Sequence, residues 1–284
     1  MNHTRRNPKT SDQRAFPIAL VCLCLTALPA SAHEFWLDPE SSVATPGQSL
    51  SIGMRVGQDL VGQALPYLDT VVREMKHWPS GTSSQVNARL GDRPAMQDVA
   101  LKQPGLHRFT VDTNPAYIVF DTLPEFTEYL EYEGLDDIAE RHMDRQLPKV
   151  DIAESYIRNA RTLVQVGPVA PDHLDAPTGM PFEIVVEGNP FAADQSEIDL
   201  KLTWQGKPAP DTQIAVFHKP DGVKDLPPAT RTLVTTNGEG VATLDLSIAG
   251  QYLLNAVRMD PVQGPGSVVW QSHWASLTFH LPAP

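Results

Sequence analysis

Alternation of apolar and polar residues, with a period of two, is the dominant pattern along most of the chain. In the first half it runs through residues 50–56 and 106–111. In the second half it recurs, with turn-forming segments between, at residues 198–204, 214–216, 241–246, 251–257 and 268–280. A period of two predicts β-strands with one buried face. The sequence therefore predicts a mainly β protein.

Residues 124–166 interrupt this alternation with helical spacing. Phe126, Tyr129 and Leu130 share one face of a predicted helix that ends at Gly134, and a second short helix follows. Apolar residues from 152 to 164 also recur at helical spacing, and Gly167 stands where a C-cap would lie. We therefore expect a helical insertion at about residues 124–166.

A segment rich in proline separates the two halves. Residues 167–181 contain four prolines and show little periodicity, which favours a linker or a domain boundary. A length of 284 residues suits two domains at about 150 residues each. We expect two β-sandwich-like domains: an N-terminal β-rich domain at 33–175, which carries the helices, and a C-terminal prealbumin-like or immunoglobulin-like sandwich at 176–284.

The first 32 residues have the organisation of a signal peptide. Basic residues precede an apolar run at 15–28, and Ala30-Ser31-Ala32 forms a cleavage site. Processing there would export the protein to the periplasm and make His33 its first residue. Both cysteines lie inside this segment, so the mature protein would contain no disulfide. The mature part has no apolar stretch near the roughly 18 residues of a membrane span.

Charge and motifs limit the classes of function. A formal charge of −12 argues against nucleic-acid binding, which needs a surplus of Lys and Arg, and favours cationic ligands. We find no Gly-x-Ser-x-Gly, no phosphate-binding glycine loop and no His-Glu-x-x-His, so we expect no enzyme. The acidic residues of segment 125–140, and His142 beyond them, are typical of a solvated helix face.

A histidine at the amino terminus can bind a metal ion through its α-amine and its ring Nδ1. His33 would have this property only after cleavage, and a second histidine would complete the three-nitrogen arrangement called a histidine brace. Such nitrogen ligands suit Cu, Ni and Zn. His273, between Trp270 and Trp274, is the best candidate for the second ligand. The structural alternatives are a frayed terminus at His33 and a hydrogen-bonded core residue at His273. Phe35, Trp36 and Leu37 argue against fraying.

Several short motifs carry a resemblance to a known family. They are His33–Pro39, Gly134-Leu135, Glu154–Tyr156, Leu163–Gly167, Gly206–Pro208, Thr235–Gly240 and Trp270–Phe279. On these motifs, residues 33–280 resemble the domain-of-unknown-function family 4198, a periplasmic family once described as a nickel-uptake component. The resemblance implies a two-part, β-rich exported protein without enzymatic activity and a link to nickel or cobalt acquisition.

One residue departs from the family pattern. Arg258 stands in Ala256-Val-Arg-Met259, where family members often have histidine. A fixed positive charge there would oppose a divalent ion at a nearby His33–His273 site.

Two functions from different classes follow. The first is an exported protein that binds a transition metal ion (Ni, Co or Cu) at His33 and His273 and acts as an accessory to nickel or cobalt uptake, with an inner-membrane transporter as its partner. The alternative is a non-catalytic envelope module that binds a protein or glycan through loops and through aromatic residues such as Tyr67 and Trp78.

Overall fold

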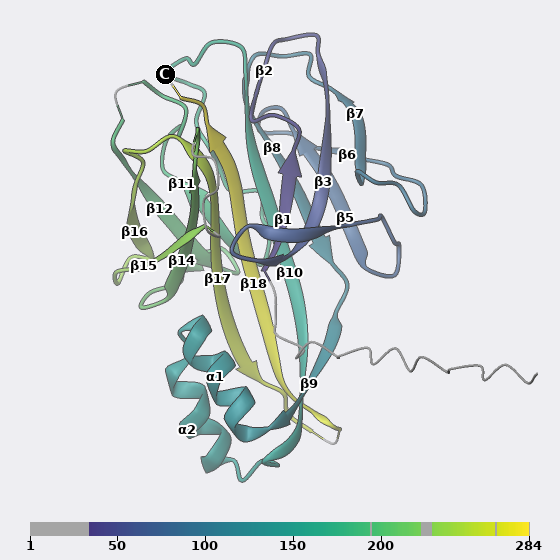
Figure 1. Ribbon diagram of the computed structural model, residues 1–284, viewed down its shortest axis with the longest axis vertical. Helices are drawn as coiled ribbons and strands as arrows, with labels where there is room; N and C mark the ends of the chain where they lie inside the picture. Colours follow the sequence, from purple (N-terminus) through teal and green to yellow (C-terminus); the bar gives the residue numbers. More distant parts are fainter. Residues whose placement is uncertain (1–33, 194, 223–228, 265, 284) are drawn as a thin grey trace, which may run out of the picture.

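The computed structural model describes residues 34–193, 195–222, 229–264 and 266–283, and it is mainly β (Figure 1). The predicted signal peptide and His33 lie outside the described residues. One large sheet forms the centre. In spatial order its main path contains β15 (Thr230–Thr235), β14 (Gln213–Pro220), β17 (Gly250–Pro261), β18 (Val268–Leu281), β10 (Val150–Val166), β8 (Gly105–Thr113), β5 (Val72–Trp78) and β6 (Ser84–Gln85). Two further strands, β2 (Val43–Ala44) and β9 (Ala116–Thr122), pair with β10.

Two smaller sheets cover different halves of the central sheet. The first contains β1 (Glu34–Pro39), β3 (Ser49–Gln58), β4 (Val61–Leu65) and β7 (Met96–Ala100). The second contains β11 (Phe182–Val186), β12 (Glu197–Trp204), β13 (Lys207–Pro208) and β16 (Val241–Asp245). Each encloses its own core, one including Leu37, Ile52 and Phe109 and the other Leu200 and Leu254. The fold thus consists of two sandwich-like units that share the central sheet.

The shared sheet crosses the predicted domain boundary. Strand β10, from the N-terminal region, pairs in parallel with β18, from the C-terminal region, over ten residue pairs from Ala153↔Val268 to Thr162↔Thr278. Residues 167–181 contain no helix or strand, as expected for a linker. Whether residues 176–284 fold alone stays a prediction, but their last strand has a partner from outside that range.

The helix predicted at residues 152–164 is wrong, because this segment is strand β10. Consecutive side chains of this strand are buried on opposite faces: Leu163 packs into one core and Val164 into the other. A strand buried on both faces loses the alternation of apolar and polar residues. Its apolar positions then matched a helical spacing by coincidence.

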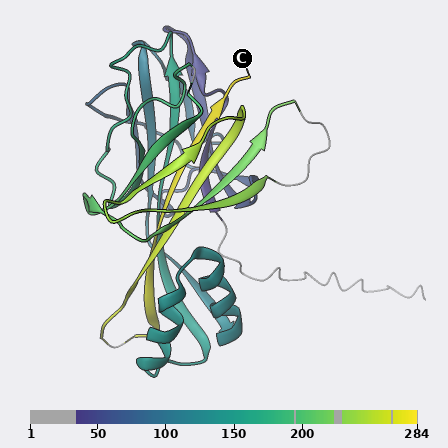
Figure 2. The same ribbon diagram turned by 90° about the vertical axis from the view of Figure 1, so that its left-hand side faces the viewer.

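The other two predicted helices are present. Helix α1 (Leu123–Glu133) begins after Thr122, whose side chain accepts a hydrogen bond from the backbone N–H of Glu125, and ends at Gly134 with φ 70°. Helix α2 (Asp136–Asp144) follows directly. Figure 2 shows both helices at one end of the molecule, beside the extensions of β9, β10, β17 and β18. None of the helices in the described ranges is long and apolar enough to cross a membrane.

His142 is not on a solvated face as expected. Its side chain is fully buried, Nε2 lies 2.8 Å from the carbonyl oxygen of Pro148, and Nδ1 accepts a hydrogen bond of 3.0 Å from the indole N–H of Trp270. Both ring nitrogens therefore have partners, which makes His142 a structural residue that joins α2 to β18.

Candidate binding site at the start of β1

Strand β1 is fixed firmly to the body of the protein. Phe35, Trp36 and Leu37 are all buried, as expected from their size and position after the predicted cleavage site. The hydroxyl of Ser276 donates a hydrogen bond of 2.7 Å to the carbonyl oxygen of Phe35. The hydroxyl of Thr278 donates one of 2.6 Å to the carbonyl oxygen of Leu37. The first described residue, Glu34, is consequently held in place and is only 1% exposed.

Three buried carboxyl groups converge on this part of the molecule from different elements. Glu34 lies on β1, Glu133 is the last residue of α1 at 4% exposure, and Glu154 lies on β10 at 1%. In each, one oxygen is buried without a hydrogen-bond partner: Oε2 of Glu34, Oε1 of Glu133 and Oε2 of Glu154. Buried polar atoms in folded proteins are nearly always satisfied. A ligand that supplies positive charge or hydrogen-bond donors could satisfy these three acceptors.

The remaining oxygens of Glu133 and Glu154 have partners that fix their side chains. The amide of Asn255 donates to Oε2 of Glu133 over 3.4 Å. Oε1 of Glu154 accepts hydrogen bonds from the hydroxyls of Tyr129, at 3.3 Å, and Ser272. These contacts hold both carboxyl groups on the face of the sheet that the helices cover.

Burial makes these groups hard to ionise. Desolvation raises the pKa of Glu34 and of Glu154 to about 7, and it raises the pKa of Glu133 well above its usual value. The charge of Glu34 is the next largest cause for Glu133, so these two carboxyl groups lie close enough to repel each other when both are ionised. Nearby Arg231 favours their ionised forms, which lowers the pKa of both.

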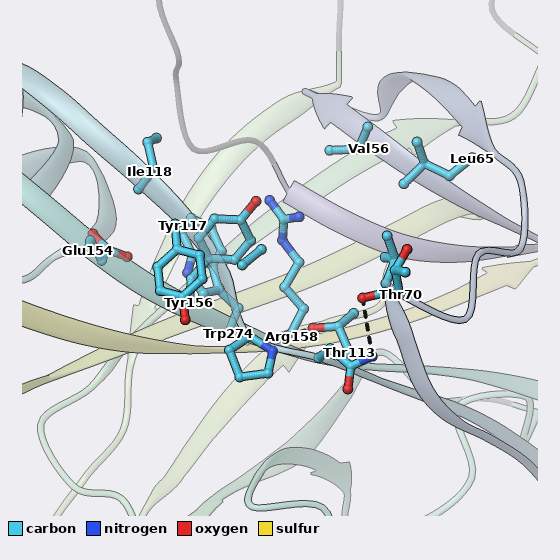
Figure 3. Close-up of a pocket in the computed structure, with 14 residues that line it drawn as sticks. Val56, Leu65, Thr70, Thr113, Tyr117, Ile118, Glu154, Tyr156, Arg158 and Trp274 are labelled. Carbon is cyan, nitrogen blue, oxygen red and sulfur yellow. Dashed lines mark hydrogen bonds between the residues drawn. The ribbon is translucent and has the colours of Figure 1, made fainter. Parts of the chain in front are cut away.

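A cavity of about 460 Å³ opens beside this cluster (Figure 3). Glu154, Tyr156 and Arg158 line it from alternate positions of β10, and Trp274 lines it from β18. The guanidinium carbon of Arg158 lies 4.5 Å from the ring centre of Tyr156, 5.9 Å from that of Trp274 and 5.8 Å from that of Phe35. Tyr117, on the edge strand β9, adds a third aromatic wall and is 67% exposed.

His273 lies on the other side of β18 from this cavity. Its ring centre is 4.6 Å from that of Trp204 on β12, whereas the next residue, Trp274, faces Tyr129 of α1. The guanidinium of Arg258 lies 4.2 Å from the same Trp204 ring, and Arg258 is the β17 residue directly opposite His273. Burial lowers the pKa of His273 to about 4, and its Nδ1 has no hydrogen-bond partner.

The predicted pairing of His33 with His273 stays a prediction, because His33 lies outside the described residues. Within the described ranges, no group of three or more His, Cys, Asp or Glu side chains has a geometry that could hold a metal ion. A site built from described residues would therefore need further ligands.

Sequence reasoning nominated none of the three carboxyl groups as a ligand, since its candidates were His33 and His273. Glu133 and Glu154 were missed for different reasons. Glu133 belongs to an acidic run that is otherwise mostly exposed, but its spacing from Tyr129 and Leu130 places it on the buried face of α1, which the sequence could have shown. Glu154 lies in strand β10, which was predicted as a helix, so the spacing of residues did not indicate that its side chain faces this region.

The aromatic residues expected to bind a partner are not freely exposed. Tyr67 is half-buried and packs against the core beneath β1, and the half-buried Trp78 donates its indole N–H to the hydroxyl of Thr110 at 3.2 Å. Tyr117 is the large exposed aromatic residue beside the cavity.

Comparisons with known proteins identify the family and little else. Among solved structures, the D0-D1 domain of intimin matches with 12% sequence identity, 87% coverage of this chain, 97% coverage of that chain and a TM-score of 0.19, which is too low to support an argument. No curated protein matches. Residues 30–260 match the family model described as "Domain of unknown function (DUF4198)". The chain belongs to the DUF4198 family.

Proposed function

We propose that this protein is an exported, periplasmic metal-binding protein that holds a transition metal ion at the start of β1, with ligands from His33, Glu34 and Glu133. The observation that carries the proposal is the pair of buried carboxyl groups at Glu34 and Glu133, each with an oxygen that has no hydrogen-bond partner.

The physical argument starts from the cost of these carboxyl groups. An ionised carboxylate without a partner is strongly unfavourable in a dry environment, and a protonated one still leaves an acceptor unsatisfied. A bound cation removes both penalties because it replaces the proton and accepts the lone pairs of the orphaned oxygens. Arg231 is close enough to influence both groups but makes its described hydrogen bond to the carbonyl oxygen of Tyr132, over 2.6 Å.

His33 would supply the remaining ligands. It is bonded to Glu34, which β1 holds beside Glu133, and cleavage after Ala32 would give it a free α-amine as well as its imidazole. Amine and imidazole nitrogens together with carboxylate oxygen suit nickel, cobalt and copper. The family resemblance to a supposed nickel-uptake component supports nickel or cobalt, and we propose an accessory role in their uptake, with transfer to an inner-membrane transporter.

The first measurement is the intact mass of protein isolated from the periplasm, which should correspond to a chain that begins at His33. Calorimetric titration of that protein with nickel, cobalt, copper and zinc should then show binding of one ion. Affinity should rise with pH, since the amine, with an ordinary pKa of about 7.7–8.0, must lose its proton to bind.

Variants separate the ligands. Glu34→Gln, Glu133→Gln and a chain with one extra residue before His33 should each bind the metal at least about tenfold more weakly. Glu128→Gln, on the exposed side of α1, is the matched control. His273→Gln should bind normally if the ion lies at Glu34, whereas a loss in that variant would favour the His33–His273 site.

Two outcomes would contradict metal binding at this place. One is a mature chain that starts at another residue, and the other is an affinity that the extra residue does not change. Failure of all four ions to bind would instead favour the non-catalytic envelope module.

A further inference from the structure

The cavity beside Glu154 has features that a metal site does not require. Three aromatic side chains, Tyr117, Tyr156 and Trp274, line it, and Val56, Leu65 and Val71 add an apolar wall. Its volume of about 460 Å³ is within the usual range for pockets that hold small organic molecules. Walls of this kind favour the binding of a flat apolar molecule, because binding removes aromatic and aliphatic surface from water.

Two side chains of opposite charge line the cavity and would orient a polar ligand in it. Glu154 and Arg158 are four residues apart on one strand, which places both side chains on the same face, with Tyr156 between them. Oε2 of Glu154 has no partner and its side chain is 1% exposed, so it offers an acceptor to a ligand's hydrogen-bond donor. The guanidinium of Arg158 lies among the rings of Tyr156, Trp274 and Phe35 and supplies positive charge.

We propose that this cavity binds a small aromatic carboxylate that carries a hydroxyl or amine donor at the end opposite its carboxylate. The ring lies between the aromatic walls, the carboxylate faces Arg158 and the donor faces Glu154. A purely apolar molecule would leave the Glu154 oxygen unsatisfied, and an inorganic cation would meet the positive charge of Arg158 and gain nothing from the rings.

The test uses three probes that differ in one group at a time: 4-hydroxyphenylacetate, phenylacetate without the hydroxyl, and 4-methylphenol without the carboxylate. Binding to the metal-free mature protein is measured by calorimetry and by the fluorescence of the tryptophans. 4-Hydroxyphenylacetate should bind at least about tenfold more tightly than either of the other two, the difference expected for loss of one buried charge-assisted contact.

Matched variants assign each end of the probe. Glu154→Gln should reduce the preference for 4-hydroxyphenylacetate over phenylacetate, and Arg158→Gln should abolish the preference over 4-methylphenol. The controls Glu128→Gln and Arg89→Gln change exposed residues away from the cavity and should leave all three affinities unchanged. If Arg158→Gln does not fold, Tyr117→Ala keeps the test decisive, because it removes an exposed wall and should weaken all three probes.

The outcomes distinguish this inference from metal binding. The chain with one extra residue before His33 should bind 4-hydroxyphenylacetate as the wild type does, even where its metal affinity is lost. Absence of binding at millimolar probe in folded protein, equal affinities for the three probes, or unchanged binding in Tyr117→Ala would overturn the inference.

Discussion

Two groups of buried charges in this protein differ in how completely they are satisfied. In the first, Arg161 of β10 donates to Asp175 of the linker and to Glu183 of β11, and all three side chains are buried. Each of the four carboxylate oxygens there also accepts a hydrogen bond from the backbone N–H of a neighbouring residue. In the second, Glu34, Glu133 and Glu154 each keep an oxygen without a partner.

The difference favours a structural role for the first group and supports the binding role proposed for the second. The Arg161 group attaches the proline-rich linker to both neighbouring strands. All four of its carboxylate oxygens have partners within the protein, although Nε of Arg161 is buried without one. The carboxyl groups near β1 have the same burial but an incomplete set of partners. Burial of a carboxyl group alone therefore does not single out a candidate site, and the oxygens without partners are the further observation on which the proposed site rests.

The largest expected effect is on the Arg161 group. Arg161→Met should lower the free energy of unfolding by about 3–5 kcal/mol, because it leaves two carboxylates buried without their cation. Urea denaturation measures the change, and Arg89→Met, at an exposed position, should change stability little. A loss below about 1 kcal/mol would show that the group does not hold the linker in place.

A buried base should make the stability of the protein depend on pH in the acid range. His77 stacks on Phe109 with ring centres 4.4 Å apart, and its Nε2 lies 2.9 Å from Nδ1 of His107. Burial, and then the charge of His107, lower its pKa from 6.5 to about 4. Since the folded pKa is below the unfolded one, stability should be full above pH 6.5 and fall by roughly 3 kcal/mol as the pH drops to 4.

His77→Gln removes that titration while keeping a side chain that can hydrogen-bond to His107. Its free energy of unfolding should fall less than that of the wild type between pH 6.5 and 4. Parallel curves for the two proteins would assign the acid response to other groups.

The same substitution in the two groups should have opposite consequences. Glu183→Gln should cost about 1–3 kcal/mol, because the amide nitrogen cannot accept a hydrogen bond. In place of Oε1 it would lose the bond from Arg161, and in place of Oε2 it would lose those from the backbone N–H groups of Thr178 and Gly179. Glu133→Gln should leave the metal-free protein as stable or more stable at pH 8, since it removes a desolvated carboxyl group. Thermal unfolding of both variants compares them directly. A similar loss of stability in each would show that the two groups of carboxyl groups do not differ in this way.

The smallest effect is expected at an exposed ion pair. Arg141 and Asp137 are four residues apart on α2, with nitrogen and oxygen 2.9 Å apart and exposed side chains. Asp137→Asn should change stability by no more than about 0.5 kcal/mol, because water and salt screen such pairs. A larger change would show that charge pairing matters on this protein even without burial.

Local pattern predicted several strands, because strands such as β12 and β16 have one exposed and one buried face. The strands at residues 198–204 and 268–280 and the two helices before and after Gly134 all follow from spacing. Burial of both faces does not by itself explain the failure at strand β10, since β18 is buried on both faces as well. The apolar residues of β10 also match helical spacing. Its position at the centre of the shared sheet also decides how the two halves are joined.

The candidate site shows the same limit. The sequence by itself predicted that an apolar run anchors the residues after the expected cleavage site, and it placed His33 and Glu34 there. Only the tertiary structure brought Glu133 from α1 and Glu154 and Arg158 from β10 to that place, and put His273 on the opposite side of β18. The physical reason is that the spacing of side chains shows only which face of an element is buried. Contacts between residues distant in sequence depend on how whole elements pack together. That packing also decides which buried charges find partners.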